Sequence, residues 1–187
     1  MFELRPYQKE AVQAIENEWI NGNKKTLLVC PTGTGKTQIF SSVIKDQISD
    51  GSKALILAHR NELLDQASSR LKNTYGIETA LEKAESTSVG SPLNVTVASI
   101  QSLANPSRLN KFNKDYFKTI VVDEAHHCLA DTYQRVLSHF ENANVLGVTA
   151  TPDKADHKNL GEYFDSKAFL APIKKVRLAD GGCEESS

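Results

Sequence analysis

Short apolar runs rich in β-branched residues alternate along the chain with longer stretches of helix-like composition. The runs are apolar nearly throughout, which is typical of parallel strands covered on both faces. They lie at Thr26–Cys30, Ala54–Ala58, Asn94–Ser99, Thr119–Val122 and Val145–Val148. Helices are predicted at Tyr7–Ile20, Thr37–Ile48, Glu62–Asn73 and Asp131–Phe140, with Asn61 placed as the N-cap of the third. This alternation predicts an α/β fold in three layers, a mostly parallel sheet with helices on both faces.

Three regions depart from this rhythm. Residues 82–92 are rich in Ser, Thr and Gly and predict a surface loop. Residues 108–118 interleave basic and aromatic side chains, which could form a nucleic-acid patch, although a solvated linker anchored by its aromatic residues is the favoured interpretation. Residues 174–187 have little to bury and predict a disordered tail, so we expect one domain over residues 1–173.

Composition narrows the class of protein. The 187 residues are 40% hydrophobic and 24% charged, which suits one globular domain. Their net charge of −1 excludes a polycation, so any nucleic-acid contact needs a local basic patch. The three cysteines form no CxxC pair, which favours a reducing, cytoplasmic location. No apolar run approaches the length that spans a bilayer, so we expect no membrane contact.

A glycine-rich segment follows the first predicted strand and opens a helix. Its sequence is Pro31-Thr32-Gly33-Thr34-Gly35-Lys36-Thr37. Glycines in this setting let successive backbone N–H groups face phosphate oxygens, so the segment predicts a P-loop for ATP. Lys36 would reach the β- and γ-phosphates and the Thr37 hydroxyl would ligate Mg²⁺. Cys30 stands where the strict pattern has its first glycine, and the competing interpretation is a plain turn with a solvated lysine.

Two adjacent carboxylates, Asp123 and Glu124, end the apolar run 119–122. Ligands of open α/β sheets bind beyond the carboxyl ends of the strands, so this pair is expected beside the P-loop. Asp123 would then hold Mg²⁺ and Glu124 would polarise the water that attacks the γ-phosphate. A polar strand end that merely faces solvent is the alternative.

Six segments between Leu4 and Pro152 resemble motifs of superfamily 2 helicases and translocases and follow one another in the family's order. The branch that they resemble is that of restriction-enzyme translocases and excision-repair helicases. The P-loop is one of these segments. Motifs II and III are matched by Asp123-Glu124-Ala125-His126 and Thr149-Ala150-Thr151-Pro152. The other three are the adenine-recognising Q motif at 4–8, motif Ia at 58–66 and the next nucleic-acid-contacting motif at 97–103.

The resemblance implies the N-terminal RecA-like lobe of a DNA helicase that uses ATP and Mg²⁺. It implies that Gln8 binds the adenine edge, supported by Arg5, and that His126, Thr149 and Thr151 couple nucleotide state to domain movement. DNA is preferred over RNA on family character alone. Nucleic-acid contacts would come from His59, Arg60, Ser99, Gln101 and Ser102.

The family's second RecA-like lobe is not recognisable here, since only about 35 residues follow Pro152. That lobe supplies an arginine finger, so the chain alone is expected to be weak or inactive. A non-catalytic nucleic-acid- or protein-binding module is the alternative, and motif order argues against a P-loop kinase. Adjacent residues cannot easily converge on one metal, so we expect no zinc at His126-His127-Cys128.

Overall fold

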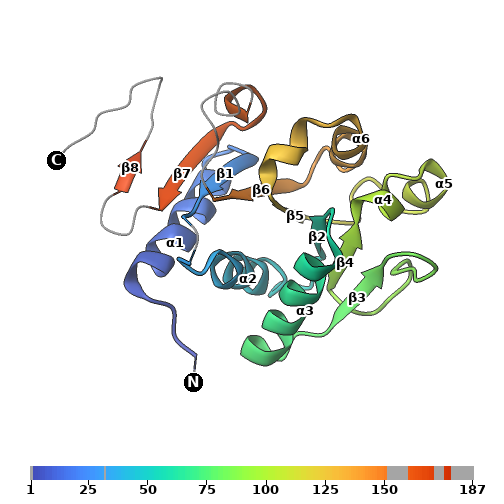
Figure 1. Ribbon diagram of the computed structural model, residues 1–187, viewed down its shortest axis with the longest axis horizontal. Helices are drawn as coiled ribbons and strands as arrows, with labels where there is room; N and C mark the ends of the chain where they lie inside the picture. The colour runs from blue at the N-terminus through green and yellow to red at the C-terminus, as the bar shows by residue number, and fades with distance from the viewer. Residues whose placement is uncertain (1, 32, 151–159, 171–174, 178–187) are drawn as a thin grey trace.

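The computed structural model describes residues 2–31, 33–150, 160–170 and 175–177 (Figure 1). Its centre is a sheet in which the described strands follow the order β3-β4-β2-β5-β6-β1-β7-β8. Neighbouring strands are parallel except for the antiparallel pair β7–β8. The strands are β1 Lys25–Val29, β2 Ala54–Ala58, β3 Thr79–Glu82, β4 Val95–Ser99, β5 Thr119–Asp123, β6 Asn144–Thr149, β7 Ser166–Leu170 and β8 Lys175–Arg177.

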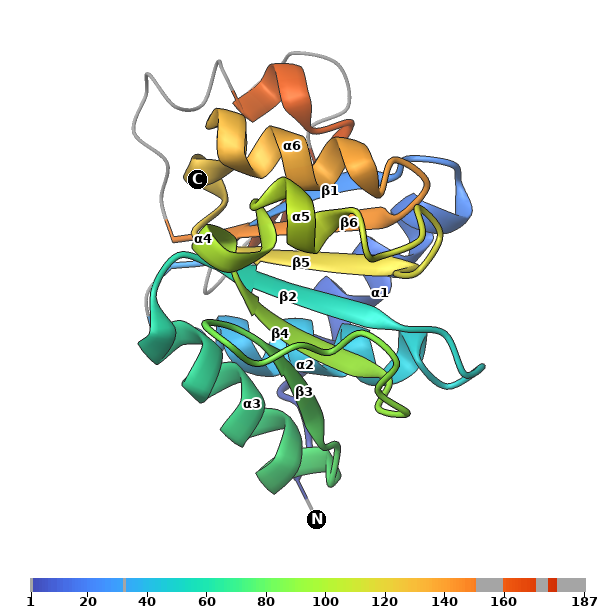
Figure 2. The same ribbon diagram turned by 90° about the vertical axis from the view of Figure 1, so that its right-hand side faces the viewer.

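Helices cover both faces of this sheet, which confirms the predicted three layers. Figure 2 shows α1, α2 and α3 on one side and α4, α5 and α6 on the other. A helical turn over residues 160–163 lies on the second side, near α6. The helices are α1 Pro6–Ile20, α2 Lys36–Gln47, α3 Asn61–Tyr75, α4 Ile100–Leu103, α5 Pro106–Leu109, the 3₁₀ helix η1 Ala125–Leu129 and α6 Asp131–His139.

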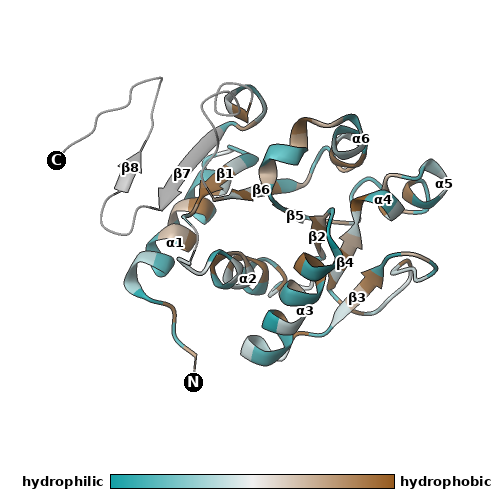
Figure 3. Ribbon diagram, in the orientation of Figure 1, coloured by the Kyte–Doolittle hydropathy of each residue, from teal (hydrophilic) through white to brown (hydrophobic). Residues whose placement is uncertain are grey.

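The strands divide their side chains between two apolar clusters, one on each face. Leu27 and Val29 pack into the cluster beneath α4 to α6, whereas Leu28 between them packs beneath α1 to α3. Every residue of β2 is buried, as its uniformly apolar sequence predicts. The hydropathy colouring of Figure 3 shows brown segments on the strands and mixed colours on the helices. Burial on both faces therefore explains why the strands read as continuous apolar runs.

The five predicted strands and four predicted helices are all present, each within two residues of its expected bounds. Strand β3 was not predicted because it is a short edge strand of mixed polarity. Its last residue, Glu82, is fully buried, as is Ser88, so the expectation of a surface loop from residue 82 is wrong at these two positions. Asn61 is the first helical residue of α3 and Arg60 occupies the N-cap, which corrects the predicted cap.

Two further expectations concern the C-terminal half of the sequence. The stretch 108–118 is anchored by its aromatic residues, as expected, since Phe112 and Phe117 are buried in the core, and the role of its basic residues stays a prediction. Strand β8 lies inside the segment expected to be disordered, so that expectation fails for these three residues. Residues 174 and 178–187 lie outside the described part of the chain. No helix within the described ranges is long and apolar enough to cross a membrane.

Candidate active site

The sheet register brings three strand ends together. Val29 at the end of β1 pairs with Thr149 of β6, and Val148 of β6 pairs with Asp123 of β5. The Cys30 amide then donates a hydrogen bond of 2.8 Å to the carbonyl oxygen of Thr149. β6 lies between β5 and β1 in the sheet. The segments that follow β1 and β5 therefore start close together, at the carboxyl ends of these strands (Figure 1).

Two glycines in the loop after β1 have backbone angles that suit the predicted phosphate loop. Gly33 and Gly35 have φ angles of +85° and +81°, in the left-handed region that favours glycine. Gly35 is the N-cap of α2 and gives no side-chain cap, which leaves the first amides of the helix available for phosphate oxygens. The Thr34 hydroxyl donates to the Pro31 carbonyl at 2.6 Å and closes the loop. Thr32 lies outside the described residues.

Lys36 and Asp123 are joined across the site. The lysine Nζ lies 3.1 Å from Oδ1 of Asp123, whose side chain is only 5% exposed. The Glu124 amide donates to the same oxygen at 2.9 Å. A buried carboxylate is stable here because the lysine neutralises it. The phosphates of bound ATP would pair with Lys36, and the Asp123 carboxylate would then be free to bind a cation.

The oxygen donors at this edge fit Mg²⁺. The Asp123 carboxylate and the Thr37 hydroxyl are the hard ligands that Mg²⁺ prefers. Thr37 lies in the first turn of α2, directly after the lysine that now neutralises Asp123. These two residues would hold the cation, with water and phosphate oxygens completing its shell.

Gln8 ties α1 to the P-loop. Its Nε2 donates to the Thr34 carbonyl at 3.1 Å and to Oε1 of Gln38 at 3.3 Å, while its Oε1 accepts from the Arg5 amide at 3.0 Å. Tyr7 adds a hydrogen bond of 3.3 Å from its hydroxyl to the same Thr34 carbonyl. The side-chain amide is thus buried and engaged with protein on both ends, and the backbone of Arg5 supports it. Contact of Gln8 with adenine stays a prediction.

Nitrogen atoms of three side chains lie close to the carboxylate of Glu124, and Arg60 donates a hydrogen bond to it. Arg60 Nη2 lies 2.6 Å from Oε1, and His59 Nδ1 lies 3.3 Å from Oε2. His127 Nε2 lies 3.7 Å from that second oxygen. Glu124 itself has a φ of 56°, an unusual left-handed conformation for a residue with a side chain. Glu124, the candidate hydrolytic base, therefore lies against His59 and Arg60, two of the predicted nucleic-acid contacts.

His127 is a site residue that the sequence did not single out. Its imidazole lies 4.1 Å, centroid to centroid, from that of His59 and 4.2 Å from that of His126. Burial and the neighbouring histidines lower the pKa of His127 below its usual value, which favours the neutral ring. The i,i+3 spacing from Glu124 along η1 is the signal that could have identified it. His126, the predicted coupling residue, is exposed.

The remaining nucleic-acid candidates form a network beside His59. The Ser99 hydroxyl donates to Oε1 of Gln101 at 2.8 Å, and Nε2 of Gln101 donates to the carbonyl oxygen of His59 at 3.0 Å. Ser102 accepts from the Ala84 amide at 3.1 Å. These side chains gather where β2 and β4 end, next to Arg60. Their contact with nucleic acid stays a prediction.

The remaining predicted residues are the coupling candidates Thr149 and Thr151 and the cysteines. Thr149 is buried at the end of β6, while Thr151 lies outside the described residues.

Burial raises the pKa of Cys30, and it raises that of Cys128 to about 12, so both thiols stay protonated at neutral pH. Cys30 is a packing residue, as expected, with Sγ 2.6 Å from the Thr34 hydroxyl oxygen.

A different set of three residues has the geometry of a possible metal site, although no zinc is expected. Donor atoms of His59, Glu124 and His127 all lie within 4.8 Å of one another. The guanidinium of Arg60 contacts the same carboxylate, however, and a fixed positive charge there disfavours a divalent cation. The carboxylate of the trio is already paired with Arg60.

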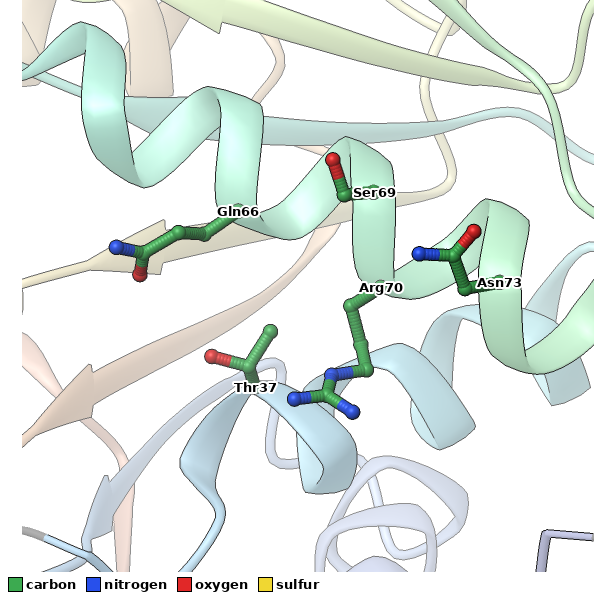
Figure 4. Close-up of a pocket in the computed structure, with 5 residues that line it drawn as sticks. All are labelled: Thr37, Gln66, Ser69, Arg70 and Asn73. Atoms are coloured by element: carbon green, nitrogen blue, oxygen red, sulfur yellow. The ribbon is translucent and has the colours of Figure 1, made fainter.

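A polar cavity of about 350 Å³ opens beside the P-loop, between α2 and α3 (Figure 4). Figure 4 shows the guanidinium of Arg70 directed toward Thr37, the candidate Mg²⁺ ligand. The lining residues are Thr37, Gln66, Ser69, Arg70 and Asn73. Solvent can therefore reach the cation side of the predicted phosphate site.

A phosphate cradle next to an acidic strand end, on a parallel sheet covered by helices on both faces, defines a P-loop NTPase domain of the RecA-like type. Residues 1–154 match the family described as type III restriction enzyme, res subunit, and the chain belongs to that family.

Curated relatives are much longer than this chain. It is 34% identical over 187 residues to the putative ATP-dependent helicase IRC3 of Saccharomyces cerevisiae, covering 92% of this chain and 27% of the relative. It is 30% identical over 195 residues to the type I restriction enzyme EcoAI endonuclease subunit of Escherichia coli, covering 93% of this chain and 24% of that subunit. The chain thus spans about a quarter of these relatives.

Solved structures agree on the fold. The helicase domain of Hef from Pyrococcus furiosus superposes with a TM-score of 0.77 at 19% identity, covering 91% of this chain and 39% of that one. A fragment of a putative HsdR subunit of a type I restriction enzyme from Vibrio vulnificus gives a TM-score of 0.67 at 24% identity, covering 89% of this chain and 30% of that one. At such identities the likeness concerns the fold alone.

Proposed function

We propose that this chain is the ATP-binding lobe of a nucleic-acid-dependent helicase or translocase. The observation that carries the proposal is the ion pair of 3.1 Å between Lys36 and Asp123, which links the phosphate cradle to the acidic strand end. Mg-ATP would replace that single contact by two, lysine to phosphate and aspartate to cation. Glu124, the next residue, is then the base that polarises the attacking water.

Full turnover needs groups that the described residues do not bring to the cradle. A second RecA-like lobe would supply an arginine to the γ-phosphate, an effect worth roughly 10³–10⁵ in rate. The relatives named as helicases and as a restriction-enzyme subunit support DNA or RNA as the track, with DNA the proposed one. The protonated, buried thiols of Cys30 and Cys128 suit a reducing, intracellular setting.

The test is a titration with a fluorescent ATP analogue, with and without Mg²⁺, on wild type, Lys36→Ala and Lys111→Ala. Lys111 is exposed and distant in sequence from the cradle, so its variant controls for the loss of one positive charge. Mg²⁺-dependent binding that is lost only in Lys36→Ala supports the proposal. Absence of nucleotide binding by wild type contradicts it and leaves a non-catalytic binding module.

A further inference from the structure

The strongest unexplained contact in the site is the ion pair between Arg60 and Glu124. These residues are 64 positions apart, and they belong to segments that resemble a nucleic-acid-contacting motif and the hydrolysis motif. A distance of 2.6 Å between Nη2 and Oε1 is that of a charge-assisted hydrogen bond. The pair thus joins the predicted nucleic-acid side of the lobe to its nucleotide side.

In this arrangement Arg60 holds one oxygen of the Glu124 carboxylate. Oε1 accepts the hydrogen bond from Arg60 Nη2, whereas Oε2 lies 3.3 Å from Nδ1 of His59 without a hydrogen bond. A general base must present an oxygen within hydrogen-bond reach of the proton that it accepts. While the guanidinium holds the carboxylate, Glu124 is not free to turn toward that proton.

The two partners differ in exposure, and the difference favours exchange. The side chain of Arg60 is 54% exposed, whereas that of Glu124 is 22% exposed. An ion pair with one well-solvated member contributes little net stability, so Arg60 can change partner at small cost. A guanidinium binds a phosphate diester through the same forked geometry that it uses for a carboxylate.

The surroundings of Arg60 suit a polyanionic strand. Arg60 follows the end of β2, and Gln101 of the neighbouring β4 end donates to the carbonyl of His59, the residue before it. Exposed side-chain amides of this kind hold nucleic-acid backbones in register. Arg60 is the cation among them.

We infer that Arg60 is a positioning residue that exchanges the Glu124 carboxylate for a nucleic-acid phosphate, so that binding of the strand releases the hydrolytic base. The inference rests on the proposed function and adds its regulation. Carboxylate and phosphate then compete for one guanidinium, and by linkage each weakens the other's hold on it.

Competition can be measured without ATP turnover. Binding of fluorescein-labelled single-stranded and duplex DNA oligonucleotides would be followed by anisotropy for wild type, Glu124→Gln, Arg60→Ala and the double variant. Glu62→Gln is the matched control, since Glu62 is an exposed carboxylate in the first turn of the adjoining α3. This control measures the general effect of removing one negative charge near the proposed nucleic-acid site.

Glu124→Gln is expected to tighten DNA binding by about threefold to tenfold, because the arginine loses its internal competitor. Glu62→Gln should change affinity by about twofold at most, and Glu124→Gln should have no effect once Arg60 is alanine. Equal tightening with and without Arg60 overturns the inference while leaving the proposed function intact. Failure of wild type to bind either oligonucleotide, with nucleotide binding preserved, overturns both the inference and the proposed nucleic-acid track.

Discussion

Gln8 fills the space that any side chain at Gly35 would occupy. A Cβ atom at residue 35 would lie 2.5 Å from Nε2 of Gln8, closer than real Cβ contacts come. The glycine is needed twice, because its φ of +81° is also strained for any other residue. Because residue 35 has no Cβ atom, the buried side chain of Gln8 can hydrogen-bond to the P-loop backbone at Thr34.

Gly35→Ala should therefore impair nucleotide binding as well as stability. We expect a loss of about 1–3 kcal/mol in the free energy of unfolding and a loss of Mg-ATP binding of tenfold or more, to an order of magnitude. Gly51→Ala is the control, since Gly51 has a φ of +85° and open space around its missing Cβ. Equal effects of both variants on ATP binding would refute the role of the Gln8 contact.

Glu82 should act as a buried clamp for the segment that follows β3. Its Oε2 accepts from the amide of Ser88 at 2.6 Å and from the hydroxyls of Ser88 and Thr87, each at 3.1 Å. Its Oε1 lies 3.0 Å from Nη1 of Arg108. An amide in place of the carboxylate removes the ion pair with Arg108 and one of the two oxygen acceptors of this buried site.

Glu82→Gln should lower the free energy of unfolding by about 2–3 kcal/mol, as measured by urea denaturation at pH 7. The nearby Glu85→Gln, at an exposed position, should change it by about 0.5 kcal/mol or less. Identical denaturation midpoints for the two variants would rule out the clamp.

Glu16 gives the stability of the protein a measurable dependence on pH. Burial, reinforced by the neighbouring carboxyl group of Asp46, raises the pKa of Glu16 from 4.5 to about 7. The folded state therefore binds a proton that the unfolded state releases between pH 4.5 and 7. Across that window the contribution of Glu16 to stability is present at low pH and is lost as the pH rises.

Glu16→Gln mimics the protonated acid and should remove this contribution. Since Glu16 is partly exposed, wild type should lose on the order of 1 kcal/mol relative to the variant between pH 5 and pH 8. Urea denaturation at both pH values measures the difference, and the exposed Asp65→Asn should keep the wild-type pH dependence. Parallel pH profiles for wild type and Glu16→Gln would contradict the raised pKa of Glu16.

The sequence was most informative where structure is local. β2 could be read from Ala54–Ala58 because every residue of it is apolar, and the glycines at 33 and 35 marked a phosphate loop before any packing was known. It was least informative for edge elements. β3 ends on the buried charge of Glu82, whose burial depends on Ser88 and Arg108 and not on its own neighbours.

The sequence by itself determined five of the strands, the four longest helices and the residues of the predicted phosphate cradle, because these follow from short-range periodicity and backbone preference. Only the tertiary structure decided that β1 lies between β6 and β7, and that Glu124 meets Arg60 and His59. Strand order and such distant contacts result from burying two faces of one sheet at once. That balance depends on the whole chain, so no single segment encodes it.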